Sequence, residues 1–282
     1  MSGHPIERFS APNSIQAGVP LKKVIDARLV DLISDSLEQV FSHFSTSRFK
    51  ISAKNGLEEL ELKERAAHIA DALQRELPDD FEESSKILIQ SFGPELEATQ
   101  DYGLQPFFYM PHAALIGRYS SNHFDAGMRA NYELTKRFTA EFSIRGYIIE
   151  HRDKSLELLR QWTRDPNPHV RRLVSEGSRP RLPWAIRLKE IDTNPDLTLP
   201  LLEILKDDPE LYVRRSVANH LGDIGKANLP TLLQTSERWL VETRSMTDPV
   251  HIKNRRWVIR HALRHPAKKQ HKEALRIRLN AK

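Results

Sequence analysis

Apolar residues recur every three or four positions along most of this chain, which is the spacing of amphipathic helices. The segments with this spacing are 21–51, 57–77, 81–92 and 122–149, the last with a short break near Phe138. An aromatic stretch interrupted by Gly and Pro separates the third segment from the fourth. No stretch shows the sustained alternation of period two that marks a strand. The pattern therefore predicts an all-α fold.

The second half of the chain contains an internal repeat of 43 residues. When the chain is shifted by this length against itself, ten of the 24 positions from 153 to 176 are identical. The shared features are a Leu-rich helix, an Asp-Pro turn at Asp165 and Asp208, and a second helix that begins near Val-Arg-Arg. A weaker third copy runs from Leu232 to Arg264. Two helices in 40–47 residues is the HEAT/armadillo period, which predicts a helical-repeat solenoid with a concave face.

The two ends of the chain differ from this repeat region. Residues 1–20 contain three prolines among polar residues, and we expect a flexible N-terminal arm there. We assign residues 21–265 to one HEAT-like repeat domain and residues 266–282 to a basic C-terminal helix or tail.

A charged row is expected beside the buried stripe formed by Val170, Val174, Val213, Val217 and Leu221. Residues four positions apart are neighbours on a helix. In this row an Arg is paired with a carboxylate or an amide four residues away. Its members are Glu141, Arg145, Arg172, Glu176, Arg215, Asn219 and Asp223. Further along the chain, Arg256 and Arg260 continue the row with positive charge alone. Each pair has two interpretations: a working surface, or a routine surface pair worth about 0.2–0.5 kcal/mol, including an Arg that ties one repeat to the next.

Charge is distributed unevenly along the sequence. The last 32 residues hold eleven Lys or Arg and one acid, whereas residues 1–250 hold 32 basic and 37 acidic residues. A basic end of this kind suggests a polyanionic partner, most commonly nucleic acid, or alternatively a solvated tail.

The sequence argues against several classes of function. There is no Cys, which excludes disulfides, thiolate catalysis and Cys-based zinc sites. Walker, GxGxxG, GxSxG and HExxH motifs are absent, and the twelve His residues show no clear ligand spacing, so we expect neither metal nor cofactor. No run of about 18 apolar residues predicts a membrane span. We expect a cytoplasmic monomer.

Four segments of the sequence are similar to a known family. HVRRLVSEGSRPRLPW, YVRRSVANHLGDIGK, RFTAEFSIR and LKERAAHIADAL resemble the bacterial DNA alkylation-repair glycosylases of the AlkC/AlkD group, and the AlkC side more closely. The resemblance extends from about Leu21 to Leu263. It implies a HEAT-like solenoid that holds duplex DNA in a concave groove and excises N-alkylated bases such as 3-methyladenine without flipping them.

The resemblance also implies roles for individual residues. Glu141, Glu176 and Asp223 match carboxylates at the lesion site, Trp184 matches an aromatic residue in the groove, and Arg172 matches a DNA-contacting arginine. From the charged row we add Arg145, Arg215, Asn219, Arg256 and Arg260 as candidates for DNA contact. Some AlkC-type proteins carry a further immunoglobulin-like domain for which we expect no counterpart here, so its grip on DNA is expected either to come from the basic C-terminus or to be absent.

One alternative stays open on the residues alone. A non-catalytic HEAT-repeat scaffold that binds nucleic acid or protein has the same repeat and the same basic end. Trp184 is equally compatible with a core position, whereas Trp162 aligns with Leu205 in the repeat and is assigned to the core.

Overall fold

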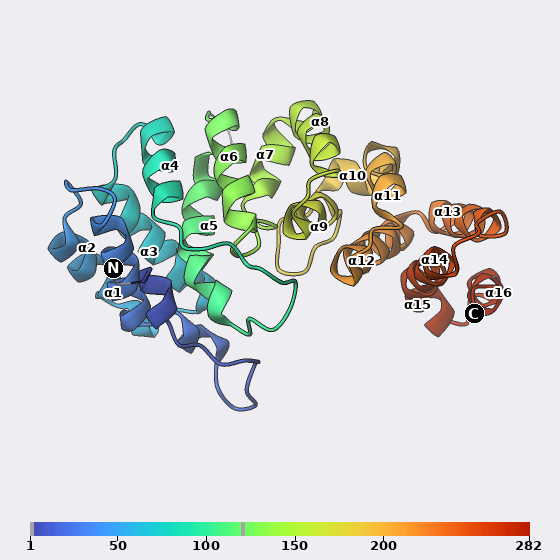
Figure 1. Cartoon of the computed structure of the whole chain (residues 1–282), viewed down its shortest axis with the longest axis horizontal. Helices are drawn as coiled ribbons and strands as arrows, with labels where there is room; N and C mark the ends of the chain where they lie inside the picture. The colour runs from blue at the N-terminus through green and yellow to red at the C-terminus, as the bar shows by residue number, and fades with distance from the viewer. Residues whose placement is uncertain (1–2, 120–121) are drawn as a thin grey trace. The chain divides into compact units, whose positions relative to one another are not determined.

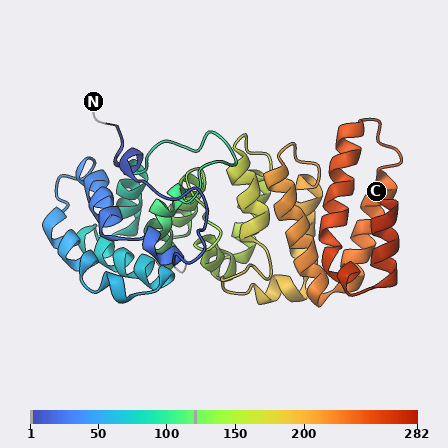
Figure 2. The same ribbon diagram turned by 90° about the horizontal axis from the view of Figure 1, so that it is seen from below.

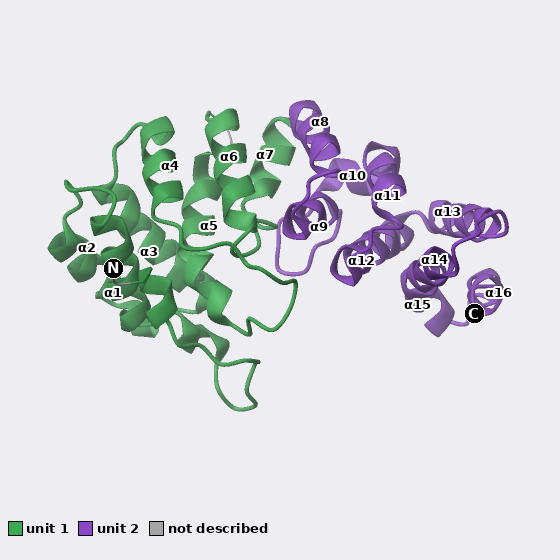
Figure 3. Cartoon of the chain, in the orientation of Figure 1, with its two compact units in different colours: residues 1–151 green, residues 152–282 purple. Residues whose placement is uncertain are grey.

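The computed structural model describes residues 3–119 and 122–282, which form two compact units, 1–151 and 152–282 (Figure 3). Within the described ranges the regular elements are all helical, which confirms the all-α prediction. The boundary falls inside the range 21–265 that the sequence analysis treats as one domain. The 43-residue repeat lies within the second unit.

The described residues of unit 1 form seven α-helices and several short 3₁₀ turns (Figure 1). They are α1 (Ala27–Glu38), α2 (Thr46–Lys54), α3 (Leu62–Glu76), α4 (Phe81–Gln90), α5 (Met110–Ile116), α6 (Phe124–Thr135) and α7 (Ile144–Glu150). The 3₁₀ turns are Pro5–Arg8, Leu21–Val24, Leu57–Glu59, Gln105–Tyr109 and Gly117–Tyr119. Helix α3 packs against α5, and α4 packs against α6. The predicted break near Phe138 is the connection between α6 and α7.

The start of the N-terminal segment, residues 4–9, packs onto the rest of unit 1, whereas residues 13–20 of the predicted arm are exposed. Its apolar side chains account for the difference: Pro5 is buried in a 3₁₀ turn, and Phe9 packs against Phe108 with ring centroids 5.7 Å apart. The imidazole Nε2 of His4 also lies 2.9 Å from the carbonyl oxygen of Ser91.

Unit 2 consists of helix pairs in two layers. Its helices are α8 (Arg152–Trp162), α9 (Pro168–Gly177), α10 (Lys189–Thr193), α11 (Leu199–Leu205), α12 (Leu211–Ala227), α13 (Leu229–Glu242), α14 (Pro249–Ala262), α15 (Arg264–Lys268) and α16 (Lys272–Asn280), with a 3₁₀ turn at Pro195–Leu197. Helices α8, α11 and α13 form one layer, and α9, α12 and α14 form the other. The orange and red helices of Figure 2 stand side by side in this unit.

The repeated Asp-Pro and Val-Arg-Arg motifs build the same turn twice. The side chain of Asp165 accepts from the backbone N–H of Asn167 at 2.8 Å, and that of Asp208 accepts from Glu210 at 2.9 Å. Arg171 then donates to the carbonyls of Asp165 and Pro166, as Arg214 does to those of Asp208 and Pro209. The first arginine of each motif therefore fastens the helix to the turn before it.

Arg171 has a second partner in the next repeat. Its guanidinium contacts the carboxylate of Asp208 with two hydrogen bonds, of 2.6 and 3.1 Å. The hydrogen bonds and the charge of Asp208 raise the pKa of Arg171, against the effect of burial. The inter-repeat tie therefore belongs to Arg171, which leaves the neighbouring Arg172 on a different face of α9.

The predicted buried stripe is confirmed. Val170 and Val174 of α9 and Val213, Val217 and Leu221 of α12 are all completely buried. Trp162 is also in the core, with 9% of its surface exposed. The basic C-terminus ends in a packed helix, since Ala274 and Ile277 of α16 are buried and α16 packs against α13.

Candidate active site

Two of the three predicted carboxylates meet on one arginine in unit 2. Glu176 lies in the last turn of α9, and Asp223 lies four residues before the end of α12. Arg179 follows α9 directly and bridges them. Its Nη1 donates to Glu176 Oε1 at 2.6 Å, and its Nε and Nη2 lie 2.8 and 2.7 Å from Asp223 Oδ2. All three side chains are buried.

The other carboxylate oxygens of this group also have protein partners. Ser216 donates to Glu176 Oε2 at 2.6 Å, and Lys226 Nζ lies 2.7 Å from Asp223 Oδ1. Arg172, the residue expected to pair with Glu176, lies 3.5 Å from it, so that prediction holds in the structure although Arg179 is the closer partner. The carboxylates are thus fixed in place and partly neutralised.

Glu176 is charged in this arrangement. Burial alone raises the pKa of a carboxyl group, but Arg172 and Arg179, together with the hydrogen bond from Ser216, hold the pKa of Glu176 below its usual 4.5. The same group acts on Arg179, whose pKa is raised by Glu176 and Asp223 despite its burial. Glu176 is therefore ionised at neutral pH, and its negative charge lies close to the buried positive charge of Arg179.

The loop after Arg179 presents Trp184. Its indole is 73% exposed, and its backbone has a φ of 62°, in the left-handed region that non-glycine residues rarely adopt. Arg181 donates to the buried carboxylate of Asp192 at 2.8 and 3.1 Å, and Arg187 donates to the same carboxylate. The loop is thus fastened to α10 on both sides of Trp184. The structure places this residue at the surface of unit 2, and the core alternative is wrong.

The third carboxylate, Glu141, lies in unit 1, in the turn before α7. The hydroxyl of Thr139 donates to its Oε2 at 2.8 Å, and the side chain is half-buried, which makes it the most accessible of the three. Arg145, four residues later, is completely buried. A phosphate contact needs an accessible guanidinium, so we leave Arg145 out of the proposed DNA-contacting set.

The remaining candidates for DNA contact lie on two helices of unit 2. Arg215 is exposed on α12, and Arg256 and Arg260 are half-buried on α14. Asn219 is half-buried and uses its Oδ1 to accept hydrogen bonds from Arg264 at 2.8 Å and from His261 at 3.1 Å. It therefore orients other side chains.

Arg179 and Asp192 are the residues of this site that spacing along a helix does not reveal. Arg179 is three residues from Glu176 but lies in a loop, and its second partner and both partners of Asp192 lie outside the reach of a three- or four-residue pattern. Asp223 is 44 positions away from Arg179. Only the alignment of consecutive repeats hints that these positions share a neighbourhood.

In the described part of the chain, no three His, Asp or Glu side chains are grouped as a metal ion would require. None of its helices has the length and apolar character needed to cross a membrane.

Comparison with known proteins gives two extensive matches. The chain is 32% identical over 258 residues to the uncharacterized protein YhaZ of Bacillus subtilis (strain 168), covering 91% of this chain and 67% of that protein. The structure superposes with a TM-score of 0.79 on the Pseudomonas fluorescens alkylpurine DNA glycosylase AlkC, solved bound to DNA containing an abasic site analog. That match has 32% identity and covers 93% of this chain and 68% of the AlkC chain. No protein-family model matches the sequence.

Proposed function

Because the chain belongs to the AlkC-like family of bacterial DNA alkylation-repair glycosylases, we propose that it binds duplex DNA and hydrolyses the N-glycosidic bond of cationic N-alkylated purines such as 3-methyladenine. The observation that carries the proposal is the meeting of Glu176 and Asp223, from consecutive repeats, around Arg179. No cofactor enters the proposed reaction.

The lesion's own charge explains why carboxylates suffice. A purine alkylated at N3 or N7 is positively charged and is already a good leaving group. As it departs, positive charge develops on the deoxyribose. A carboxylate about 4 Å from that charge, at an effective dielectric near 20, contributes roughly 4 kcal/mol. This corresponds to about three powers of ten in rate, before the costs of desolvation and screening are subtracted.

The three carboxylates have different surroundings and therefore different proposed roles. Glu141 is accessible, so we assign it the contact with the sugar and with the attacking water. Glu176 and Asp223 are buried, and their oxygens are occupied, so they act through their fixed negative charge. Arg172 and Lys226 lie at the edge of this pair and are suited to turn towards phosphates when DNA binds.

Trp184 is proposed to contact the DNA directly. Its ring is exposed on a loop that two arginine–Asp192 pairs hold in place. An aromatic side chain presented in this way can pack against the deoxyribose or the base edges near the lesion while the base stays stacked. Such a mode avoids the cost of unstacking, which is a few kcal/mol.

The test is base release from methylated duplex DNA. We expect the wild-type chain to release 3-methyladenine above the spontaneous rate and Glu141→Gln to lower the rate by about two to three powers of ten. Glu150→Gln removes an exposed carboxylate at the end of α7 and serves as the matched control, with an unchanged rate. No release by the wild-type protein above the spontaneous background would refute the proposal.

A second function is supported by one observation. Every carboxylate oxygen of Glu176 and Asp223 has a protein partner, as in a purely structural ion network. A non-catalytic scaffold that binds DNA is therefore the alternative. It predicts that Glu141→Gln leaves every measured property unchanged, and that duplex DNA binds without release of a base.

A further inference from the structure

Five arginines gather in unit 2: three act electrostatically on His261, and the other two, Arg256 and Arg260, join them through Arg278. They come from α12, α14, α15 and α16, and α14 packs against the other three helices (Figure 1). The arginines are Arg215, Arg256, Arg260, Arg264 and Arg278. We call this group the arginine cluster. His261 itself stacks on Trp257, with ring centroids 4.8 Å apart.

The arginine cluster is poor in counterions: Asp223 acts on Arg264, but burial and the charge of Arg179 outweigh it and lower the pKa of that arginine. Neighbouring cations do have counterions: Arg255 pairs with Asp207 and Glu242, and Arg276 with Glu237 and Glu273. Within residues 3–119 and 122–282, none of the five cluster arginines forms an ion pair with a carboxylate. The buried Nε atoms of Arg256 and Arg278 also have no hydrogen-bond partner in these ranges. Such an arrangement costs free energy unless an anion is supplied from outside.

The arginines of the cluster repel one another, and their positive charges contribute to the lowered pKa values of Arg260 and His261. Burial and the charges of Arg278 and Arg256 lower the pKa of Arg260. Burial lowers the pKa of His261 from 6.5 to about 4, with further contributions from Arg264, Arg215 and Arg278. No carboxylate contributes in the opposite direction at His261. The imidazole is therefore neutral at physiological pH while the site is empty.

Hydrogen bonding fixes which nitrogen of His261 carries its proton. Arg264 Nη2 lies 2.8 Å from the side-chain Oδ1 of Asn219, and because arginine can only donate, that atom must be the carbonyl oxygen. The same Oδ1 lies 3.1 Å from His261 Nε2, so Nε2 donates. In the neutral ring Nδ1 then holds a lone pair and stays available to take up a proton.

We propose that the arginine cluster is a binding site for the phosphodiester backbone of duplex DNA, and that His261 takes up one proton at Nδ1 when the site is filled. The inference rests on the proposed function for the identity of the polyanion. The groups that face His261 are Arg215 and Asn219 of α12, Arg264, Arg278 of α16, and Trp257 of its own helix. Phosphates placed among them supply the missing negative charge and remove the repulsion that keeps the ring neutral.

The proton uptake makes DNA affinity depend on pH in a defined direction. If bound phosphates restore the imidazole pKa to about its ordinary 6.5, the complex holds a proton that the empty site lacks between about pH 4 and 6.5. Affinity then rises as the pH falls. Between pH 7.5 and 5.5 the expected gain is about tenfold, and it belongs to His261 alone.

The experiment measures the affinity of an undamaged, fluorescently labelled DNA duplex across this pH range at constant low salt. His261→Gln keeps a donor for Asn219 but cannot titrate, and we expect it to lose the tenfold gain. His265→Gln is the matched control, an exposed histidine of α15 in the same basic region, and should keep it. Equal pH dependence in the wild type and in His261→Gln would overturn the coupling.

Two further measurements test the proposal, and the first uses only the wild-type protein. Calorimetric titration of the wild-type protein in buffers of different ionisation enthalpy should show uptake of a proton at pH 5.5, and no uptake would refute the proposal. Arg278→Gln should lower the slope of log affinity against log salt by about one. Arg276→Gln, on the same helix but paired with two glutamates, should leave the slope unchanged. An equal effect of both would refute the site.

These outcomes are distinct from those of the base-release assay. Undamaged DNA contains no leaving base, so the binding measurements succeed or fail whether or not the protein is a glycosylase. Base release without a pH effect at His261 would refute only the present inference. Proton-linked binding without base release would refute only the proposed reaction.

Discussion

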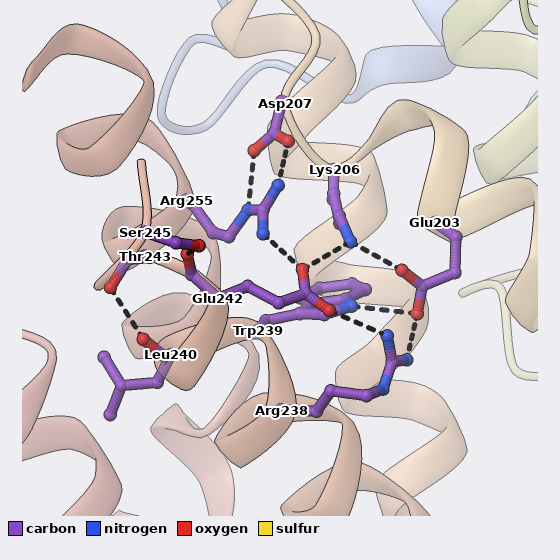
Figure 4. A network of polar contacts seen from close by, with 10 residues as sticks. All are labelled: Glu203, Lys206, Asp207, Arg238, Trp239, Leu240, Glu242, Thr243, Ser245 and Arg255. Atoms are coloured by element: carbon purple, nitrogen blue, oxygen red, sulfur yellow. Dashed lines mark hydrogen bonds and ion pairs between the residues drawn. The ribbon is translucent and has the colours of Figure 1, made fainter. Parts of the chain in front are cut away.

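Two groups of charged side chains in unit 2 share helix α14 and differ in one property. In the first, shown in Figure 4, positive and negative side chains alternate. Lys206 contacts Glu203 at 2.6 Å and Glu242 at 2.9 Å, and Arg255 contacts Glu242 and Asp207. In the second, the arginine cluster, the described residues form no ion pair with any of its arginines, and Asp223 acts on Arg264 only from farther away. Arg255 and Arg256 are adjacent in sequence, yet they belong to different groups.

The difference separates charges that hold the fold from charges that await a ligand. In the alternating network each cation is satisfied within the chain, and the Nε1 of the buried Trp239 donates to Glu203 at 2.9 Å. The network thereby joins α11, α13 and α14. In the cluster, the repulsion between arginines is an energetic cost of the empty protein that only an added anion removes. A count of charges along the sequence does not distinguish the two cases.

We expect the largest effect from Arg179. It pairs with carboxylates of the chain, like the cations of the alternating network, and it also lies in the candidate active site. Arg179→Gln leaves Glu176 and Asp223 buried without their shared cation, and we expect the free energy of unfolding to fall by about 3–5 kcal/mol. Urea denaturation measures it.

A double variant provides the control for Arg179. Glu176→Gln combined with Arg179→Gln removes one carboxylate with the arginine, and it should recover part of the lost stability. If Arg179→Gln alone is as stable as the wild type, the buried group contributes nothing to the fold, and its place among the paired charges is wrong.

The adjacent arginines of α14 give the next effect in size. Arg255→Gln breaks contacts with two partly exposed carboxylates, and we expect it to lower the free energy of unfolding by about 2 kcal/mol with little change in the salt dependence of DNA binding. Arg256→Gln should leave stability within about 0.5 kcal/mol and weaken DNA binding. Denaturation and binding curves for both variants measure the contrast. If the two variants change stability and DNA binding to the same extent, the distinction between the two groups of charges is wrong.

Arg255 and Arg256 also show what could not be predicted from the sequence. The helices, the buried valine stripe and the turn at Asp165 and Asp208 were predictable, because they depend on local spacing or on identities 43 positions apart. The roles of Arg255 and Arg256 were not, because they depend on which helix packs against each side of α14. Which charged side chains form ion pairs depends on tertiary packing, so neither the composition nor the helical spacing of the sequence reveals it.

The candidate site shows the same division. The three carboxylates were selected by resemblance and by repeat position, and the structure brings Glu176 and Asp223 together. Helical spacing also selected Arg145, which is buried. It passed over Arg179, a loop residue that contacts Glu176, three positions earlier, and Asp223 of α12. A loop residue has no helical period from which its partner can be inferred.

The smallest effect separates the two groups by the pH at which each loses stability. In the cluster, burial and then Arg264, Arg215 and Arg278 lower the pKa of His261 from 6.5 to about 4, so the unfolded chain binds this proton more tightly than the folded chain does. The contribution of the neutral ring is fully present above pH 6.5 and is lost as the pH falls towards 4. We expect His261→Gln to lose less stability than the wild type over that range.

The alternating network responds in a lower window. Burial opposes the charge of Glu203, but hydrogen bonds from Arg238, Lys206 and Trp239 lower its pKa from 4.5 to about 2. Its contribution is present above pH 4.5 and is lost as the pH falls towards 2, so Glu203→Gln should be less stable than the wild type at pH 7, and the gap should close between pH 4.5 and 2. Urea midpoints measured against pH for this variant and for His261→Gln check both windows. A gap for Glu203 that stays constant to pH 2 would show that its charge is not what the network stabilises, because a purely steric loss has no reason to follow the proton.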